Sequence, residues 1–311
     1  MKQIPSSRSR RRFLQSSTVL MGSLAAAPAA PTVEPVALPR VKILDREITR
    51  LVVGSNPLYG YSHFNSILDR LMREWMTQDR RVETLQRAEA AGINTWQVHY
   101  NDPTIEDLKR YRDEGGKMHV LILADFELMK NWKLLREVAK LGPIGIGHHG
   151  NRTDERFRAG QMHIVHDFTK AVHDAGVPAG VSMHNPAVLE YVEEHGWKVD
   201  YYMTCLYRVS RTAEEARAEF GESPLLETFM EKDPERMCAF VRKTSKPCFA
   251  FKILGAGRTV NRPEQLERAF RFALGNIKPQ DAVIVGMFPK FKDEMRENAE
   301  LVRRITLERI T

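Results

Sequence analysis

The chain has 311 residues, of which 42% are hydrophobic and 28% are charged. This length and composition exclude a disordered chain and a small domain held by disulfides, and leave either two domains or one large α/β barrel. The formal net charge is +7. Five of the 47 basic residues and none of the 40 acidic ones lie in residues 1–30, so the rest of the chain is near neutral. A nucleic-acid-binding surface is therefore not expected.

The first 30 residues have the layout of an export signal. A basic segment ending at Arg12 precedes an uncharged stretch, residues 13–30, that becomes rich in alanine and is interrupted by Ser, Gly and Pro. This pattern is typical of a signal peptide and not of a stable membrane span. Residues 9–15, with the sequence SRRRFLQ, resemble the twin-arginine export motif. The resemblance implies passage through the twin-arginine export machinery, cleavage near Ala27–Ala30, and a periplasmic or otherwise exported mature protein.

Beyond residue 40, short apolar runs alternate with stretches whose apolar residues recur every three or four positions. Residues 41–43 and 47–49 predict a small hairpin. Further strands are then predicted, in chain order, at residues 51–54, 95–98, 119–123, 144–147, 179–182, 201–205, 248–252 and 282–286. Helical stretches that end in glycine precede several of these strands, as at Gly92 and Gly176, which favours parallel strands joined by helices.

The number of strands predicts the fold. Residues 41–308 fit one α/β domain, a closed (β/α)8 or TIM barrel with a short N-terminal hairpin, a fold of typically about 250 residues. The alternative is an open doubly wound sheet, but no Gly-x-Gly-x-x-Gly follows the first strand. The charged segment 214–233 lies between the sixth and seventh strands, as an insertion does. We therefore predict no domain boundary within residues 41–308.

Histidines are concentrated where the predicted strands end. His99, His148, His149 and His184 follow three of the strands, and Asp125 follows a fourth. Because the active sites of such barrels lie at the carboxyl ends of the strands, these groups are candidates for acid–base catalysis. The alternative for the set His99, Asp125, His148 and His184 is a divalent metal site. His148 and His149 are neighbours, so only one of them can point inward. Each histidine can also be a polar loop residue without a catalytic role.

Lys252 ends the seventh predicted strand. Such a lysine can form a Schiff base, bind an anionic group, or be buried and paired with Asp125. The glycine turn after it, with Gly255, Gly257 and Arg258, can hold a phosphate on its backbone amides or be a plain turn. Aromatic and amide residues that suit a small polyhydroxylated, carbohydrate-like ligand also lie near the strand ends: Asn56, Tyr59, Gln97, Tyr100 and Tyr207.

The three cysteines, Cys205, Cys238 and Cys248, are too few and too scattered for a disulfide framework or a zinc site of paired cysteines. One bridge between Cys238 and Cys248 is an open alternative in an oxidising compartment. Buried free thiols are the interpretation that we favour.

Several local strings, in the same order as the predicted elements, resemble the aldo/keto reductase superfamily. They are GINTW at residues 92–96, GVSMHN at 180–185, KILGAGR at 252–258 and VIVGM at 283–287, together with the N-terminal hairpin. The resemblance implies a (β/α)8 barrel, an NADP(H) cofactor, and hydride transfer to or from a carbonyl or sugar substrate.

The resemblance also assigns roles to individual positions. The family's catalytic histidine falls at His148 or His149, and the nearest tyrosine is Tyr100. Gln97 stands at the position of the family's aspartate, and Ala124 or Asp125 stands at the position of its lysine. The usual Asp/Tyr/Lys set is therefore not preserved. Ser182 stands at a cofactor position that the family implies. The glycine turn, with Gly255, Gly257 and Arg258, and the nearby Lys292 are the other candidate cofactor positions.

Two classes of enzyme follow from these patterns. The first is an exported oxidoreductase that uses NADP(H), with catalytic residues drawn from His148, His149, Tyr100, His99 and Lys252. The alternative is a non-redox lyase, isomerase or hydrolase that depends on histidine or a metal and acts on a carbohydrate-like substrate. A non-catalytic binding protein is a third interpretation.

Overall fold

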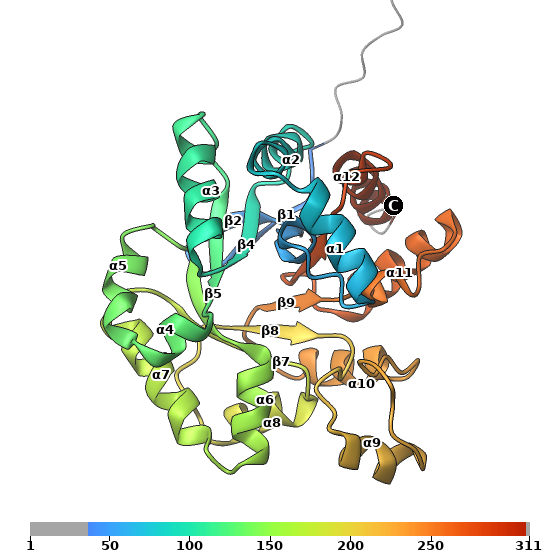
Figure 1. The fold of residues 1–311 in the computed structure, drawn as a ribbon. Helices are drawn as coiled ribbons and strands as arrows, with labels where there is room; N and C mark the ends of the chain where they lie inside the picture. Colours follow the sequence, from blue (N-terminus) through green and yellow to red (C-terminus); the bar gives the residue numbers. More distant parts are fainter. Residues whose placement is uncertain (1–36, 309–311) are drawn as a thin grey trace, which may run out of the picture. The chain divides into compact units, whose positions relative to one another are not determined.

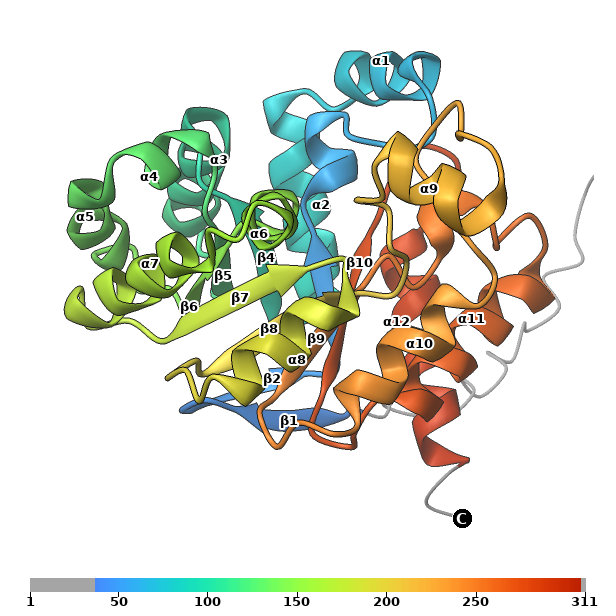
Figure 2. The ribbon, with the colours of Figure 1, turned by 90° about the horizontal axis from the view of Figure 1, so that it is seen from below.

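The structure is a computed structural model that describes residues 37–308 (Figure 1). The predicted export signal lies outside the described residues. The first two strands, β1 (Arg40–Ile43) and β2 (Arg46–Thr49), pair antiparallel and form the predicted hairpin. Asn94, which lies just before the second barrel strand, accepts a hydrogen bond from the Thr49 backbone (2.8 Å) and donates one to the Glu47 carbonyl (3.0 Å). These bonds fix the hairpin to the amino-terminal end of the barrel (Figure 2).

Eight parallel strands close into a barrel, which confirms the predicted fold. They are β3 (Leu51–Gly54), β4 (Thr95–His99), β5 (His119–Leu123), β6 (Gly145–His148), β7 (Ala179–Met183), β8 (Tyr201–Cys205), β9 (Cys248–Phe251) and β10 (Ala282–Gly286). Their order around the barrel is the order of the chain, and β10 pairs with β3 to close it, with Val283 beside Leu51. The ends of all eight lie within one residue of the predicted ones.

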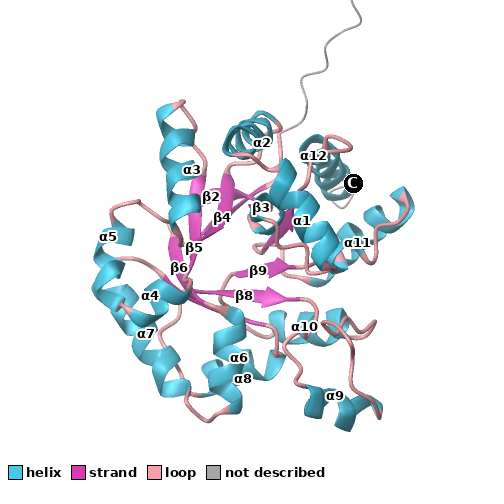
Figure 3. Ribbon diagram, in the orientation of Figure 1, coloured by secondary structure: helices cyan, strands magenta, loops and turns pink. Residues whose placement is uncertain are grey.

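Helices surround the strands on the outside of the barrel (Figure 3). They are α1 (Ser66–Trp75), α2 (Gln78–Ala90), α3 (Asp102–Asp113), α4 (Phe126–Lys130), α5 (Leu135–Ala139), α6 (Gly150–Arg158), α7 (Met162–Asp174), α8 (Pro186–Glu194), α9 (Ala213–Phe220), α10 (Asp233–Val241), α11 (Pro263–Asn276) and α12 (Glu294–Leu307). Short 3-10 turns occur at η1 (Asn56–Tyr59), η2 (Trp132–Leu134) and η3 (Gly255–Gly257). Within residues 37–308, no helix is long and apolar enough to cross a membrane.

Polar caps keep the connections at the carboxyl ends of the strands short. Asn101 follows β4 closely, and its side chain accepts a hydrogen bond from the Thr104 backbone at the start of α3 (3.2 Å). Asn185 caps α8 in the same way through the Ala187 backbone (3.2 Å). A capping side chain satisfies one of the free N–H groups of the first helical turn, so the helix can begin directly after the strand. The residues at these strand ends are therefore held by regular structure on both sides.

The interior of the barrel is filled by side chains that alternate along the strands. Val52, Leu121, Met203, Phe249 and Ile284 belong to one buried cluster that Ile43 and Ile48 of the hairpin complete. The residues between them on each strand pack outward against the helices in a second, larger cluster. At the amino-terminal end the barrel is therefore closed by apolar side chains, and the opposite end carries the polar groups.

Tyr201 occupies much of the interior, and glycines make room for it. A Cβ atom on Gly180, which pairs with Tyr201 in the sheet, would lie 2.2 Å from its ring, and one on Gly145 would lie 2.5 Å from it. Gly147 is also close, since its Cβ would lie 3.3 Å from the Tyr201 hydroxyl. These three glycines therefore face the barrel interior, which fixes the direction of every other residue on β6 and β7.

Candidate active site

The direction of the two neighbouring histidines follows from this alternation. Gly145 and Gly147 point inward, so His149 continues inward and His148 points outward. His148 is fully buried against Phe168 of α7, with ring centroids 5.2 Å apart. Its Nδ1 lies 2.6 Å from the Thr153 hydroxyl, which itself donates to the His149 carbonyl, so Nδ1 of His148 donates the proton. His148 therefore stabilises the outer layer and does not face the barrel mouth.

Titration of His148 gives a first testable prediction. Burial, with a smaller effect of His149, lowers the pKa of His148 from 6.5 to about 3. Between these values the unfolded chain binds a proton that the folded chain does not, so stability falls as the pH falls below 6.5. We expect wild type to lose about 2 kcal/mol more stability than His148→Gln between pH 7 and pH 5, measured by urea unfolding. Equal pH dependence in both proteins would contradict this, and His163→Gln, at an exposed position, serves as the matched control.

His99 and His149 meet at the mouth of the barrel. Their ring centroids are 6.0 Å apart, and Nδ1 of His99 lies 3.2 Å from the Ser55 hydroxyl. Burial lowers the pKa of His99 to about 4, with Asp125 opposing the shift. Burial also lowers the pKa of His149 to about 4, helped by the neighbouring His99 and His184. At neutral pH both rings are uncharged, so each can donate or accept a hydrogen bond without carrying a positive charge.

His184 forms a buried pair with Asp154 of α6. Its Nδ1 lies 2.9 Å from Asp154 Oδ2, and the carboxylate also accepts the backbone N–H groups of His184 (3.0 Å) and Asn185 (3.2 Å). The Asp154 side chain is fully buried and that of His184 nearly so. The carboxylate therefore holds the proton on Nδ1. Among the described residues, the hydrogen bonds of the His184 ring involve Nδ1 and none involves Nε2.

Gly150, the first residue of α6, allows this close packing. A Cβ atom there would lie 2.9 Å from Cε1 of His184 and 3.0 Å from the Ser182 hydroxyl. The first distance is shorter than real Cβ contacts and the second is tighter than most of them, so a larger residue would require the His184 side chain to shift. The start of α6 and the end of β7 are thus joined at the site.

A second histidine–carboxylate pair lies at the rim. His63, in the loop before α1, has Nε2 3.0 Å from the Asn56 amide and Nδ1 2.9 Å from Glu227. Glu227 belongs to the segment between α9 and α10. Burial lowers the pKa of His63, and Glu227 only partly opposes this. Burial favours a higher pKa for Glu227, but the hydrogen bond from His63 and the charges of His63, Lys252 and His184 together lower the pKa.

Arg258 strengthens the same contact between loops. Its guanidinium donates to the His63 carbonyl (2.9 Å) and lies 3.9 Å from the ring centre of Phe229. The segment that contains Glu227 and Phe229 is therefore fastened to the loop of His63 along one side of the mouth. The predicted insertion 214–233 thus includes two residues that contact the site.

Lys252 follows β9 directly and adopts a left-handed backbone, with φ of 56°. Burial lowers its pKa, partly opposed by Cys205 and Glu227. Its positive charge in turn affects His99, His63, Cys205 and Glu227. Burial raises the pKa of the Cys205 thiol to about 12, so Cys205 is a poor nucleophile at neutral pH. All three cysteines are buried free thiols, and no bridge joins Cys238 to Cys248.

Other predicted residues are placed as follows. Tyr100 packs against the outer apolar cluster, and Asp125 accepts a hydrogen bond from the Asn101 amide (3.4 Å). Lys292 forms an exposed ion pair with Glu297 (2.5 Å). The structure brings together His99, His149, His184 and Lys252 at the mouth, and it does not bring His148, Tyr100 or Lys292 there.

The two candidate cofactors fit these residues unequally. Within residues 37–308, no three His, Cys, Asp or Glu side chains form a group that could hold a metal ion, and His148 of the predicted ligand set faces the helices. For NADP(H), the buried Ser182 hydroxyl has no hydrogen-bond partner among the described residues and suits a carboxamide. Arg258 is occupied by His63 and Phe229, however, and Gly255 and Gly257 form a turn with φ of 56° and 88°. The fit to a dinucleotide is therefore limited to Ser182.

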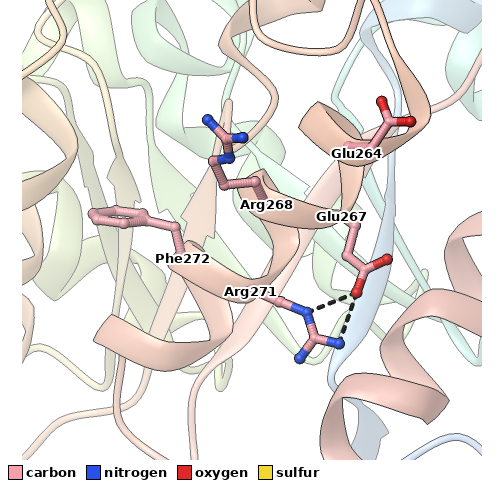
Figure 4. Close-up of a pocket in the computed structure, with 5 residues that line it drawn as sticks. All are labelled: Glu264, Glu267, Arg268, Arg271 and Phe272. Carbon is pink, nitrogen blue, oxygen red and sulfur yellow. Dashed lines mark hydrogen bonds and ion pairs between the residues drawn. The ribbon is translucent and has the colours of Figure 1, made fainter.

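A surface hollow lies elsewhere on the molecule (Figure 4). Its lining residues, Glu264, Glu267, Arg268, Arg271 and Phe272, all belong to α11. Arg271 there pairs with Glu267 (2.7 Å). Because a single outer helix lines it, this hollow is separate from the barrel mouth.

Asp154 and Glu227 are the two contacts that sequence reasoning missed. Each is one of many acidic residues on a helix or in a charged loop, and no local spacing links either to its histidine. The one available signal for Asp154 was its place in the first turns of the helix that follows the histidine-bearing strand β6.

Comparison with known proteins supports the fold. No protein-family model matches the chain, and no curated protein matches it significantly. The structure is similar to that of an aldo-keto reductase from Bacillus halodurans, with a TM-score of 0.54 and 12% identity over 86% of this chain and 90% of that one. It is also similar to a truncated 3-deoxy-D-arabino-heptulosonate 7-phosphate synthase from Thermotoga maritima, with a TM-score of 0.51 and 15% identity over 88% and 92% of the two chains. At these identities the likeness shows the (β/α)8 fold alone.

Proposed function

We propose that this barrel is an enzyme that moves a proton at the carbon next to a carbonyl group of a small polyhydroxylated substrate, as an isomerase or a lyase does. The observation that carries the proposal is the buried Asp154–His184 pair at the end of β7, beside two uncharged histidines. The resemblance to twin-arginine signals adds the proposal that the enzyme acts after export.

His184 is the proposed general base. Asp154 keeps the proton on Nδ1, so the lone pair of Nε2 is available to accept a proton from the substrate carbon. The imidazolium that forms is then stabilised by the buried carboxylate. General-base catalysis of this kind contributes roughly 10²–10⁴-fold to a rate.

His99 and His149 are the proposed groups that stabilise the substrate oxygen. Loss of a proton next to a carbonyl places negative charge on the carbonyl oxygen. An uncharged imidazole can donate an N–H hydrogen bond to that oxygen in a site with little water, where such a bond is stronger than in solution. The pKa values of about 4 keep both rings in this uncharged form at neutral pH.

The remaining polar groups favour a polyhydroxylated substrate. Gln97 points inward on β4 just below His99, and its amide nitrogen has no hydrogen-bond partner among the described residues. The Ser182 hydroxyl on β7 is likewise without a partner there. Buried polar atoms are normally satisfied, so both groups suit hydroxyl or carbonyl groups of a ligand.

An NADP(H)-dependent reductase is the second candidate. The single observation that favours it is the Ser182 hydroxyl, which lies where the resemblance to aldo/keto reductases expects a contact with the nicotinamide amide. The acid of such a reductase would be His149, since Tyr100 packs in the outer layer. Hydride transfer then needs the added dinucleotide, which separates this candidate from the first.

The test is hydrogen–deuterium exchange at substrate carbon. We expect the protein, incubated in D₂O with a panel of aldoses, ketoses and 2-oxo acids, to replace a C–H next to the carbonyl of at least one compound, observed by proton NMR without NADP(H). His184→Gln should lower the exchange rate by about 100-fold or more, and His163→Gln, at an exposed position of α7, should not. Exchange that survives in His184→Gln, or turnover only with NADP(H), would refute the proposal.

A further inference from the structure

Lys252 lies where several elements of the barrel mouth meet. Its charge acts on His99 at the end of β4, on His63 before α1, on Cys205 at the end of β8 and on Glu227 before α10. Lys252 directly follows Phe251, which pairs with Cys205 of β8 in the sheet and whose ring centroid lies 5.6 Å from that of His184. Lys252 is therefore at the carboxyl end of β9, next to residues of the mouth.

Among the described residues the amine of Lys252 has no ion pair or hydrogen bond, in contrast to two other half-buried lysines; a further one, Lys290, lies over aromatic rings instead. Lys246 pairs with Glu193 (2.6 Å), and Lys278 pairs with Asp281 (3.0 Å) and donates to the Val241 carbonyl (2.8 Å). Lys252 makes no ion pair or side-chain hydrogen bond with any residue from 37 to 308, and in particular none with Asp125. A structural lysine in such a place is normally paired, because an unpaired buried charge is costly.

The backbone of Lys252 is also held in an unfavourable conformation. A φ of 56° places a residue with a side chain in the left-handed region, which is sterically unfavourable for all residues but glycine. The next turn contributes to this geometry, since the Gly255 N–H donates to the Lys252 carbonyl (2.9 Å). Here the strained residue stands at the carboxyl end of a barrel strand, where the active-site residues of such barrels lie.

Removal from water favours the uncharged amine. Burial lowers the pKa of Lys252, and nearby Arg258 lowers it further, while Cys205 and Glu227 oppose the shift. An uncharged lysine amine is a nucleophile toward carbonyl carbon, whereas the ammonium form is not.

We propose that Lys252 forms an imine with the carbonyl carbon of the substrate before His184 removes the neighbouring proton. The proposal rests on the proton removal by His184 proposed above and deepens it, because it restricts the substrate to aldehydes and ketones. In this route His99 and His149 contact the substrate oxygen up to its departure as water, and the imine nitrogen takes the place of the carbonyl oxygen during proton removal. Three observations carry it: the amine without an ion pair or hydrogen bond among the described residues, its place directly after Phe251 at the carboxyl end of β9, and the left-handed backbone of Lys252.

The step is balanced without any cofactor. The Nζ lone pair attacks the carbonyl carbon, a C–N bond forms, and the carbonyl oxygen takes up a proton from solvent. The resulting N-protonated carbinolamine loses water, made of its hydroxyl group and one N–H hydrogen, and leaves a protonated C=N bond. This cation draws electrons from the adjacent carbon, so the C–H bond there breaks toward Nε2 of His184 and an enamine forms. Return of the proton and addition of water reverse the sequence.

Reductive trapping tests the proposal. The full mature protein is incubated separately with pyruvate, dihydroxyacetone and glyceraldehyde, each with sodium cyanoborohydride at neutral pH, and is then analysed by intact mass and peptide mapping. We expect one adduct per chain with at least one probe, formed at Lys252 about tenfold or more faster than at any other lysine. Lys252→Met should abolish it, and Lys243→Met, at an exposed lysine, should leave it unchanged.

A second variant separates an imine from a simple positive charge. Lys252→Arg keeps a cation but cannot form the imine, so deuterium exchange should fall about 100-fold or more. Retained exchange in Lys252→Arg, or labelling spread evenly over the lysines, or no labelling with any of the three probes, overturns the inference.

The two proposals can fail separately. His184→Gln should still be trapped at Lys252, because imine formation precedes proton removal. Exchange that depends on His184 without trapping would leave the acid–base function standing and remove the imine. Trapping at Lys252 without any exchange would leave the imine standing and remove the proposed role of His184.

Discussion

Asp154→Asn should lower the rate of proton exchange by on the order of 10³-fold and leave the barrel folded. The carboxylate of Asp154 accepts the Nδ1–H of His184 (2.9 Å) and two backbone N–H groups. Asparagine has nearly the same shape but presents an NH₂ group at one of these positions. Turned toward Nδ1, that group would favour the tautomer with the proton on Nε2, and the base would be lost.

The measurement is exchange in D₂O as a function of pH, alongside thermal unfolding. Asp167→Asn is a matched control, because Asp167 lies exposed on α7 and, within residues 37–308, its one ion pair is with Lys170 (3.2 Å). A structural role alone would lower the unfolding temperature of Asp154→Asn without a matching loss of exchange in the protein that remains folded. If folded Asp154→Asn keeps its rate within a factor of about three, Asp154 does not position the base.

The strands were predictable because their signals are local. Apolar runs such as residues 119–123, preceded by glycine-ended helices, depend only on residues near one another in the chain. Eight such runs imply closure, because the strand count and the chain length agree with a single fold. The hairpin and all eight strands followed from this reasoning, with ends within one residue.

The direction of His148 and His149 required one more fact. Side chains alternate along a strand, so the neighbours of Tyr201 on β6, Gly145 and Gly147, decide that His149 points inward. The sequence contained these glycines, but their meaning depends on Tyr201 of β8, more than fifty positions away. A local pattern could show that one histidine faced the mouth, but not which one.

The carboxylate partners were out of reach for the same reason. Asp154 and His184 are 30 positions apart, and His63 and Glu227 are 164 apart. Each carboxylate approaches its histidine from a different element, so no spacing motif exists. The chemistry of the site therefore depends on the closed barrel, which brings these elements to one end.

The second large effect concerns the interior of the barrel. Gly180→Ala should lower the free energy of unfolding by about 3 kcal/mol, because its Cβ would lie 2.2 Å from the buried ring of Tyr201. The Tyr201 ring cannot move aside freely. Gly145 of β6 lies close to it on one side, and the ring of Phe249 packs against it with centroids 5.6 Å apart. Chemical denaturation with urea measures the change.

A double-mutant cycle identifies the cause. Tyr201→Leu should itself destabilise, but Gly180→Ala should cost much less in that background, because the clash with the ring is gone. Gly147→Ala is the graded control: its Cβ would lie 3.3 Å from the Tyr201 hydroxyl, so it should cost less than Gly180→Ala. Tyr201→Phe should remove most of that smaller cost. Additive effects of Gly180→Ala and Tyr201→Leu would mean that the glycine is required for a reason other than the ring.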